Sequence, residues 1–109
     1  MNIAKTVDIL TSLAQETRLK TFKALVRAGL NGITAGEIGQ KIKVPQNTMS
    51  FHLSHLKKSG LIRSSRQGRN VIYSANFDET KKLVKFLLED CCSDSKEKCP
   101  IALNPSDLF

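Results

Sequence analysis

The pattern of apolar residues predicts helices at both ends of the chain. Two apolar stripes run through residues 3–14, one made of Ile3, Val7, Leu10 and Ala14 and the other of Ile9 and Leu13. Residues 16–29 carry one such stripe, and residues 77–90 carry two. Because a spacing of three and four residues places side chains on one helix face, we expect three amphipathic helices. The double stripes indicate that the first and last of these helices are covered on two sides.

The segment between them predicts two further helices joined by a short turn. Thr34 and Glu37 have the spacing of a capping box, which opens a short helix. The next helix is predicted from Pro45, which suits a first helical position, to Ser59, just before Gly60. Its inner stripe consists of Met49, Leu53 and Leu56. The turn at residues 42–45 is short enough for a helix-turn-helix, whose second helix enters the major groove of DNA.

A β-hairpin is predicted directly after this pair of helices. Two short extended runs cover Leu61–Ser65 and Asn70–Ala75. The residues between them, Arg66-Gln-Gly-Arg69, predict a turn in which glycine supplies unusual backbone angles. The order α-α-α-α-β-β-α therefore predicts a mainly α fold with a hairpin wing, which is a winged helix-turn-helix. From Cys91 onward the chain has no hydrophobic period, so we expect an irregular tail.

Length and composition limit the class of protein. The chain has 109 residues and 12.1 kDa, which suits one domain, and so small a domain would be helped by dimerisation. No apolar run approaches the roughly 18 residues that a membrane span needs. The N-terminus lacks the apolar core of a signal peptide. We therefore expect a cytoplasmic protein that does not associate with membranes.

The positive charge is concentrated in one block. The net charge is +7, and no acidic residue occurs between Ile38 and Phe77. Seven bases lie in that block, namely Lys41, Lys43, Lys57, Lys58, Arg63, Arg66 and Arg69. The rest of the chain carries ten basic and ten acidic residues, so the block accounts for the whole excess. Such a block is typical of a protein with a polyanionic partner, although a solvated basic face has the same pattern.

The helix at residues 45–59 has a polar outer face when its inner stripe is buried. Gln and Asn can read adenine through two hydrogen bonds, and apolar groups can contact the thymine methyl. Phe51 lies opposite the stripe and needs a partner, which is either DNA or another protein surface. His52 borders the stripe and is either a core histidine or a DNA contact. The predicted DNA-binding residues are Gln46, Asn47, Thr48, Ser50, Phe51, His52, Lys57, Arg66 and Arg69.

Four segments together resemble the ArsR family of winged-helix, metal-responsive repressors. They are Leu13-Ala-Gln-Glu-Thr-Arg-Leu19, Ser50-Phe-His-Leu-Ser-His-Leu56, Ser59-Gly-Leu61 and Arg66-Gln-Gly-Arg-Asn-Val-Ile-Tyr73. The resemblance covers about residues 5–90. It implies a homodimer paired through the first and last helices, which fits their double stripes. It also implies binding of double-stranded operator DNA by the helix at residues 45–59 and the wing, and no enzymatic activity.

The cysteines indicate which ligand is sensed. The Cys-Cys-x6-Cys arrangement of Cys91, Cys92 and Cys99 resembles the C-terminal site of an arsenic-responsive branch of that family. Arsenite and antimonite prefer three thiolates in a pyramid, whereas structural zinc requires four ligands. Neighbouring residues on an ideal helix point about 100° apart, so Cys91 and Cys92 reach one ion only if the helix end unwinds. Soft ions such as Cu(I) and Cd(II) remain competitors.

Taken together, these patterns predict a repressor that releases its operator when As(III), or Sb(III), binds Cys91, Cys92 and Cys99. The predicted division is a dimeric DNA-binding domain at residues 1–90 and a tail at residues 91–109 that completes the cysteine site. Four alternatives remain open. They are incidental or disulfide-forming cysteines, a thiol-oxidation or other soft-metal sensor of the same fold, a small thiol enzyme, and a protein that packs DNA without sequence preference.

Overall fold

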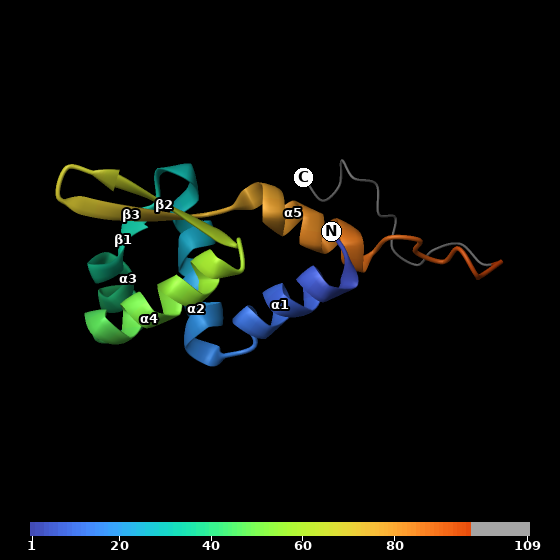
Figure 1. The fold of residues 1–109 in the computed structure, drawn as a ribbon, viewed down its shortest axis with the longest axis horizontal. Coiled ribbons are helices and arrows are strands. Elements are labelled where there is room, and N and C mark those ends of the chain that lie inside the picture. Colours follow the sequence, from blue (N-terminus) through green and yellow to red (C-terminus); the bar gives the residue numbers. More distant parts are fainter. Residues whose placement is uncertain (97–109) are drawn as a thin grey trace.

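The computed structural model describes residues 1–96, and these residues have the predicted winged helix-turn-helix order. The N-terminal helices are α1 (Ile3–Leu13) and α2 (Glu16–Ala28), followed by the 3-10 turn η1 (Gly29–Asn31) and the strand β1 (Ile33–Thr34). The helix-turn-helix is formed by α3 (Ala35–Ile42) and α4 (Gln46–Lys58). The wing consists of β2 (Ile62–Gln67) and β3 (Asn70–Ala75), and α5 (Phe77–Leu87) follows it. Figure 1 shows α1 and α5 at one end of the molecule and the tip of the wing at the other.

Polar side chains cap the N-terminal ends of four helices, including α2, where the side chain of Gln15 accepts from the N–H of Arg18. The side chain of Asn2 accepts a hydrogen bond from the backbone N–H of Lys5, and Asn76 accepts one from Glu79. Thr34 caps α3 by accepting from the N–H of Glu37 at 3.2 Å, as the capping box predicts. The second half of the box differs, because the Glu37 carboxylate accepts from the Thr34 hydroxyl rather than from a backbone N–H.

The predicted start of α4 and the predicted end of α5 are wrong. Pro45 is the N-cap of α4 and not its first helical residue, because its ψ of 146° is extended. The last helix ends at Leu87, three residues before the predicted end. Apolar residues continue the helical spacing to Leu88, but the chain enters turns there, and Asp90 and Cys92 adopt positive φ angles of 60° and 61°.

The wing belongs to a three-stranded antiparallel sheet with the strand order β1-β3-β2. The short strand β1 was not predicted, because two residues are too few to show an alternating pattern; its Ile33 pairs with Tyr73. Gly32 precedes it with a φ of 71°, and a Cβ atom there would collide with the carbonyl oxygen of Tyr73. At the tip, Gln67 pairs with Asn70, so the turn is only Gly68 and Arg69, shorter than predicted.

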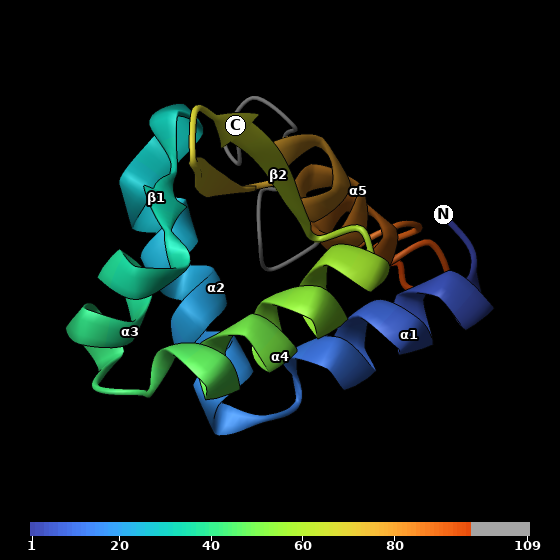
Figure 2. The same cartoon turned by 60° about the vertical axis from the view of Figure 1, so that its left-hand side comes forward.

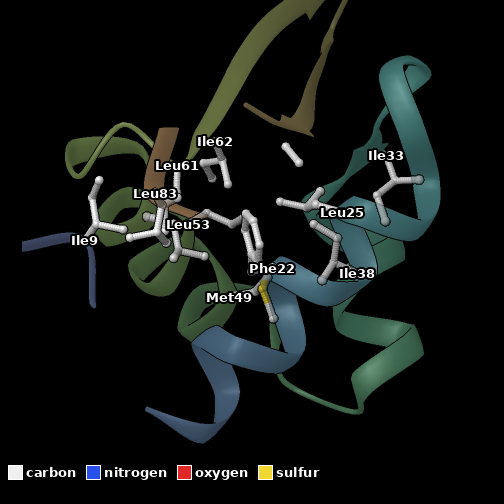
Figure 3. Packing of buried hydrophobic residues seen from close by; sticks show 12 residues of the cluster. Ile9, Phe22, Leu25, Ile33, Ile38, Met49, Leu53, Leu61, Ile62 and Leu83 are labelled. Carbon is white, nitrogen blue, oxygen red and sulfur yellow. The ribbon is translucent and has the colours of Figure 1, made fainter. Parts of the chain in front are cut away.

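The hydrophobic core fixes the orientation of α4. Met49, Leu53 and Leu56 are fully buried, which confirms the predicted inner stripe. Figure 3 shows Met49 beside Phe22 of α2, with Ile9 and Leu83 toward one end of the core and Ile33 and Ile38 toward the other. The opposite side of α4 is consequently turned to solvent. Within residues 1–96 no helix is both long and apolar enough to span a membrane.

Candidate nucleic-acid interface and thiol site

The outer face of α4 carries most of the predicted DNA-binding side chains. Gln46, Asn47, Thr48, Ser50, Phe51 and Lys57 are all exposed. No acidic residue lies in the first turn, and Pro45 offers no side-chain cap. Asn47 instead accepts a hydrogen bond from the N–H of Thr48 at 2.9 Å. This end of α4 thus combines exposed amides and hydroxyls with the positive end of the helix dipole, which suits contact with an anion.

Phe51 is the largest apolar side chain on that face. Its side chain is 59% exposed, and its ring packs edge-on against His55, with the ring centroids 4.9 Å apart. A second edge-on contact joins it to His52 at 5.6 Å. The two histidine rings hold Phe51 on the outer side of α4, where its exposed edge is available to a partner.

His52 lies on the packed side of α4 and not with the exposed DNA-binding residues. Of its two predicted roles, the structure therefore favours that of a core histidine. Only 8% of it is exposed. Its Nδ1 lies 3.4 Å from Nη1 of Arg18, which belongs to α2. Burial lowers the pKa of His52, and the positive charges of Arg18 and His55 lower it further. The ring is therefore held in its neutral form.

The wing places the other two predicted contacts at an exposed tip. Arg66 and Arg69 flank Gly68, whose φ of 64° at the first turn position is typical of a type II′ hairpin. Both arginines are exposed. Of the seven bases in the acid-free block, only Arg63 forms an ion pair with another described residue, at 3.6 Å from Asp78. The remaining cations leave their charge available to a polyanion.

Sequence reasoning missed the residues that set the angle between α3 and α4. The N–H of Val44 donates to the carbonyl of Gly39 at 2.9 Å, and a Cβ on Gly39 would lie only 2.7 Å from the Val44 carbonyl oxygen. Lys43 ends α3 in the left-handed conformation, with a φ of 59°. The only local signal was Gly39 itself, a residue without a side chain inside the predicted helix that precedes the turn. These contacts set the direction in which the chain leaves α3, and Figure 2 shows α4 running from that turn alongside α1.

The thiol pair follows α5 directly. The Sγ atoms of Cys91 and Cys92 lie 3.5 Å apart, in turns beyond the last helical residue. The expected helical geometry at this point is therefore wrong, and no unwinding is needed to bring the two sulfurs together. Cys99, the third predicted ligand, lies outside the described residues. Within residues 1–96 no group of three His, Cys, Asp or Glu side chains is arranged to hold a metal ion.

An apolar stripe of α1 faces solvent. Its residues Ile3, Val7 and Leu10 are 70%, 55% and 41% exposed, and Leu87 of α5 is 56% exposed. The other predicted stripe of α1 enters the core through Ile9, which is fully buried. The sequence thus predicted both stripes, and the structure separates them into a packed face and an open face. Contiguous exposed apolar surface of this kind is typical of a protein interface.

Comparisons with known proteins agree with the geometry. A family profile described as a helix-turn-helix domain matches residues 13–65, which run from the end of α1 into the wing. The ArsR-like transcriptional regulator of Rhodococcus sp. RHA1 superposes with a TM-score of 0.71 and 25% identity, over 84% of this chain and 82% of that one. The fold and the basic face define a winged helix-turn-helix transcriptional regulator.

Two sequence relatives narrow the class to a family. The transcriptional activator HlyU of Vibrio cholerae is 29% identical over 79% of this chain and 77% of its own. The HTH-type regulator MJ1325 of Methanocaldococcus jannaschii is 31% identical over 78% of this chain and 93% of its own. The chain belongs to the ArsR family of winged helix-turn-helix regulators, whose members regulate transcription and are not enzymes.

Proposed function

We propose that this chain is a cytoplasmic, homodimeric repressor that binds double-stranded operator DNA and releases it when As(III) binds its cysteine thiols. The observation that carries the ligand assignment is the 3.5 Å separation of the Cys91 and Cys92 sulfurs at the end of α5. DNA binding is supported by the exposed polar face of α4 and by Arg66 and Arg69 at the tip of the wing, which form no ion pair within residues 1–96.

Dimerisation through α1 and α5 is supported by the apolar stripe on α1. Ile3, Val7 and Leu10 would be covered by the same surface of a second copy, which gives the two-fold symmetric contact of a dimer. Recognition helices in such dimers enter successive major grooves about one helical turn apart. The spacing of the two α4 helices therefore depends on how α1 and α5 pack at the dimer interface.

As(III) would bind by exchanging its hydroxyl groups for thiolates. Each As–S bond that forms between arsenous acid and a cysteine thiol releases one water molecule. Cys91 and Cys92 supply two such bonds from adjacent positions, and Cys99 supplies the third in the proposal. Sb(III) has the same preference for soft thiolates and is the second candidate ligand.

Release of DNA follows if the liganded turn repositions α5. The coupling between two such sites is typically about 1–3 kcal/mol, which corresponds to a 5- to 150-fold change in operator affinity. Because α5 lies beside α1, a change at its C-terminal end is transmitted to the proposed dimer interface rather than to α4 directly. The ligand therefore alters the spacing of the recognition helices without contacting DNA.

Oxidation of the same pair is a second candidate, because the two sulfurs lie 3.5 Å apart. A disulfide between them would require the turn to rearrange, since adjacent Cα atoms are about 3.8 Å apart and those of a disulfide are usually about 4.4–6.8 Å apart. Peroxide would convert the two thiols to a disulfide, with reduction of the peroxide to two water molecules. The two candidates differ in what the protein retains. Arsenite leaves one arsenic atom bound for each site, whereas peroxide leaves a disulfide that dithiothreitol reverses.

Equilibrium dialysis tests the ligand assignment directly. The full chain, reduced and free of DNA, is dialysed against arsenite, and bound arsenic is counted by atomic absorption. We expect one arsenic atom per subunit in the wild type and in a Ser93→Ala, Ser95→Ala control from the same segment. The Cys91→Ser, Cys92→Ser variant should bind none at the same concentration. Equal arsenic content in all three proteins would refute the site.

A further inference from the structure

Arg18 connects α1 to α4 through two contacts. Its Nε atom donates to the backbone carbonyl of Ser12, in the last turn of α1, at 2.6 Å. Its Nη1 atom lies 3.4 Å from Nδ1 of His52 on α4. A second link joins the same helices, because the hydroxyl oxygens of Ser12 and Ser59 are 3.1 Å apart. We call these four residues the Arg18 cluster. Figure 2 shows α1 and α4, the two helices that these contacts join, running side by side.

The chemistry of the Arg18–His52 contact fixes the protonation state of the ring. A guanidinium has donors only, so Nδ1 must accept, and the single ring proton must lie on Nε2. A second proton, on Nδ1, would replace this hydrogen bond by two facing cations. The hollow beside Arg18, about 320 Å³ in volume, is also lined by Asp8 of α1 and by His55 and Lys58 of α4. Among the charged and titratable side chains that line this hollow, Asp8 is the one acid, and the other three are Arg18, His55 and Lys58.

We infer that Arg18 and neutral His52 hold the recognition helix against α1, and that a proton on His52 breaks this contact and weakens operator binding. This inference rests on the proposed function, because it requires α4 to read DNA and α1 to form the dimer. Under those conditions the α1–α4 contact determines where the dimer presents its two recognition helices. Arg18 is a positioning residue in this account, since it acts on DNA through His52 and α4. His52 supplies the pH dependence.

The direction of the effect follows from the linkage between protonation and structure. The pKa of His52 is lowered in the folded protein, mainly by burial and next by Arg18. The folded state with the contact intact therefore disfavours the added proton. The stability that the intact contact gives to the folded state is complete above the unperturbed histidine pKa of 6.5. This stability is lost as the pH falls through the lower pKa that His52 has in the folded protein. The contact should therefore open on acidification and not at alkaline pH.

The test is the pH profile of operator affinity, measured from about pH 7.5 to about pH 5. The probe is the duplex that the wild-type protein selects from a random DNA pool. The chain contains only two histidines, so His52→Asn and His55→Asn form a matched pair. Asparagine at position 52 keeps an acceptor near the place of Nδ1 but does not titrate. We expect affinity to fall by about fivefold or more, the lower end of the usual range of coupling between two sites, in the wild type and in His55→Asn, and to stay level in His52→Asn.

A parallel fall in all three proteins, or a fall lost only in His55→Asn, would overturn the inference. Circular dichroism of each variant at both ends of the range confirms that it is folded. If the wild type selects no duplex at any pH, the proposed function fails, and the contact is then judged without DNA. In that case the two histidines are titrated by NMR in the wild type and in Arg18→Met. A rise in the His52 pKa alone supports the contact, and unchanged midpoints refute it.

Discussion

The ammonium group of Lys5 lies 3.8 Å from the carboxylate of Glu79, so an ion pair joins α1 to α5. Glu79 is largely shielded from solvent, with 16% of its side chain exposed, and Lys82 contacts its other oxygen at 3.4 Å. The helix with the open apolar stripe and the helix that ends at the thiol pair are thus fastened to each other by a polar contact as well as by the core residues Ile9 and Leu83.

Removing this carboxylate should destabilise the fold slightly. We expect Glu79→Gln to lower the free energy of unfolding by about 0.5–1 kcal/mol, because the pair is partly exposed and its gain is offset by solvent screening. Urea denaturation measures the change. Glu16→Gln is the control, since the Glu16–Lys20 pair lies on the exposed surface of one helix. The assignment of the α1–α5 contact is wrong if the two variants lose the same stability.

The dimer interface is tested on α1. Replacing the half-exposed Val7 by glutamate places a charge in the proposed apolar contact, where it would have to be desolvated. We expect Val7→Glu to be monomeric in sedimentation experiments at concentrations where the wild type is dimeric, while its circular dichroism is unchanged. Gln40→Glu adds the same charge to an exposed position on α3 and should remain dimeric. A dimeric Val7→Glu protein would exclude this face.

The wing is tested through the salt dependence of DNA binding. Each phosphate contact that is removed reduces the slope of log affinity against log salt by about 1. We therefore expect Arg66→Ala with Arg69→Ala to flatten the slope by roughly one to two units and to weaken binding to all sequences alike. Arg63→Ala should change it less, because Arg63 is paired with Asp78. An unchanged slope in the double variant would remove the wing from the interface.

Base readout by α4 is distinguished from phosphate contact by comparing two variants. Asn47→Ala should reduce discrimination at one base-pair position of the operator by about 1–3 kcal/mol. Lys57→Ala should lower affinity for every sequence without changing the preferred one. Selection from a random DNA pool by each variant reports both effects. If Asn47→Ala selects the wild-type consensus with undiminished stringency, α4 does not read bases through Asn47.

The fold could be predicted from the sequence wherever its periodicity was long enough to read. The stripe Met49, Leu53 and Leu56 fixed both the existence of α4 and the side that it buries, and the capping residue Thr34 located the start of α3. The strand β1 has two residues and forms only because β3 lies beside it, so the local sequence does not predict it. The early end of α5 lies at Leu88, whose φ of −104° and ψ of 1° leave the helical region although the apolar spacing continues through it.

The site was predicted less completely, because its contacts join residues far apart in the chain. His52 and Arg18 are 34 positions apart, and only the packing of α2 against α4 brings them together. The outer face of α4 and the wing tip could be located from charge and helical phase alone. The proximity of the Cys91 and Cys92 sulfurs could not, since ideal helical geometry would have separated them.

The central claim is that the thiols after α5 control DNA binding, and arsenite-dependent release of the selected operator tests it most directly. Fluorescence anisotropy of a labelled duplex is followed as arsenite is added to the wild type, to Cys99→Ser and to the Cys91→Ser, Cys92→Ser variant. We expect similar affinities without arsenite, because the cysteines lie outside the basic block. The wild type should lose at least about fivefold in affinity, Cys99→Ser should respond more weakly, and the double variant should not respond. Release of DNA by the double variant at the wild-type arsenite concentration would contradict the account.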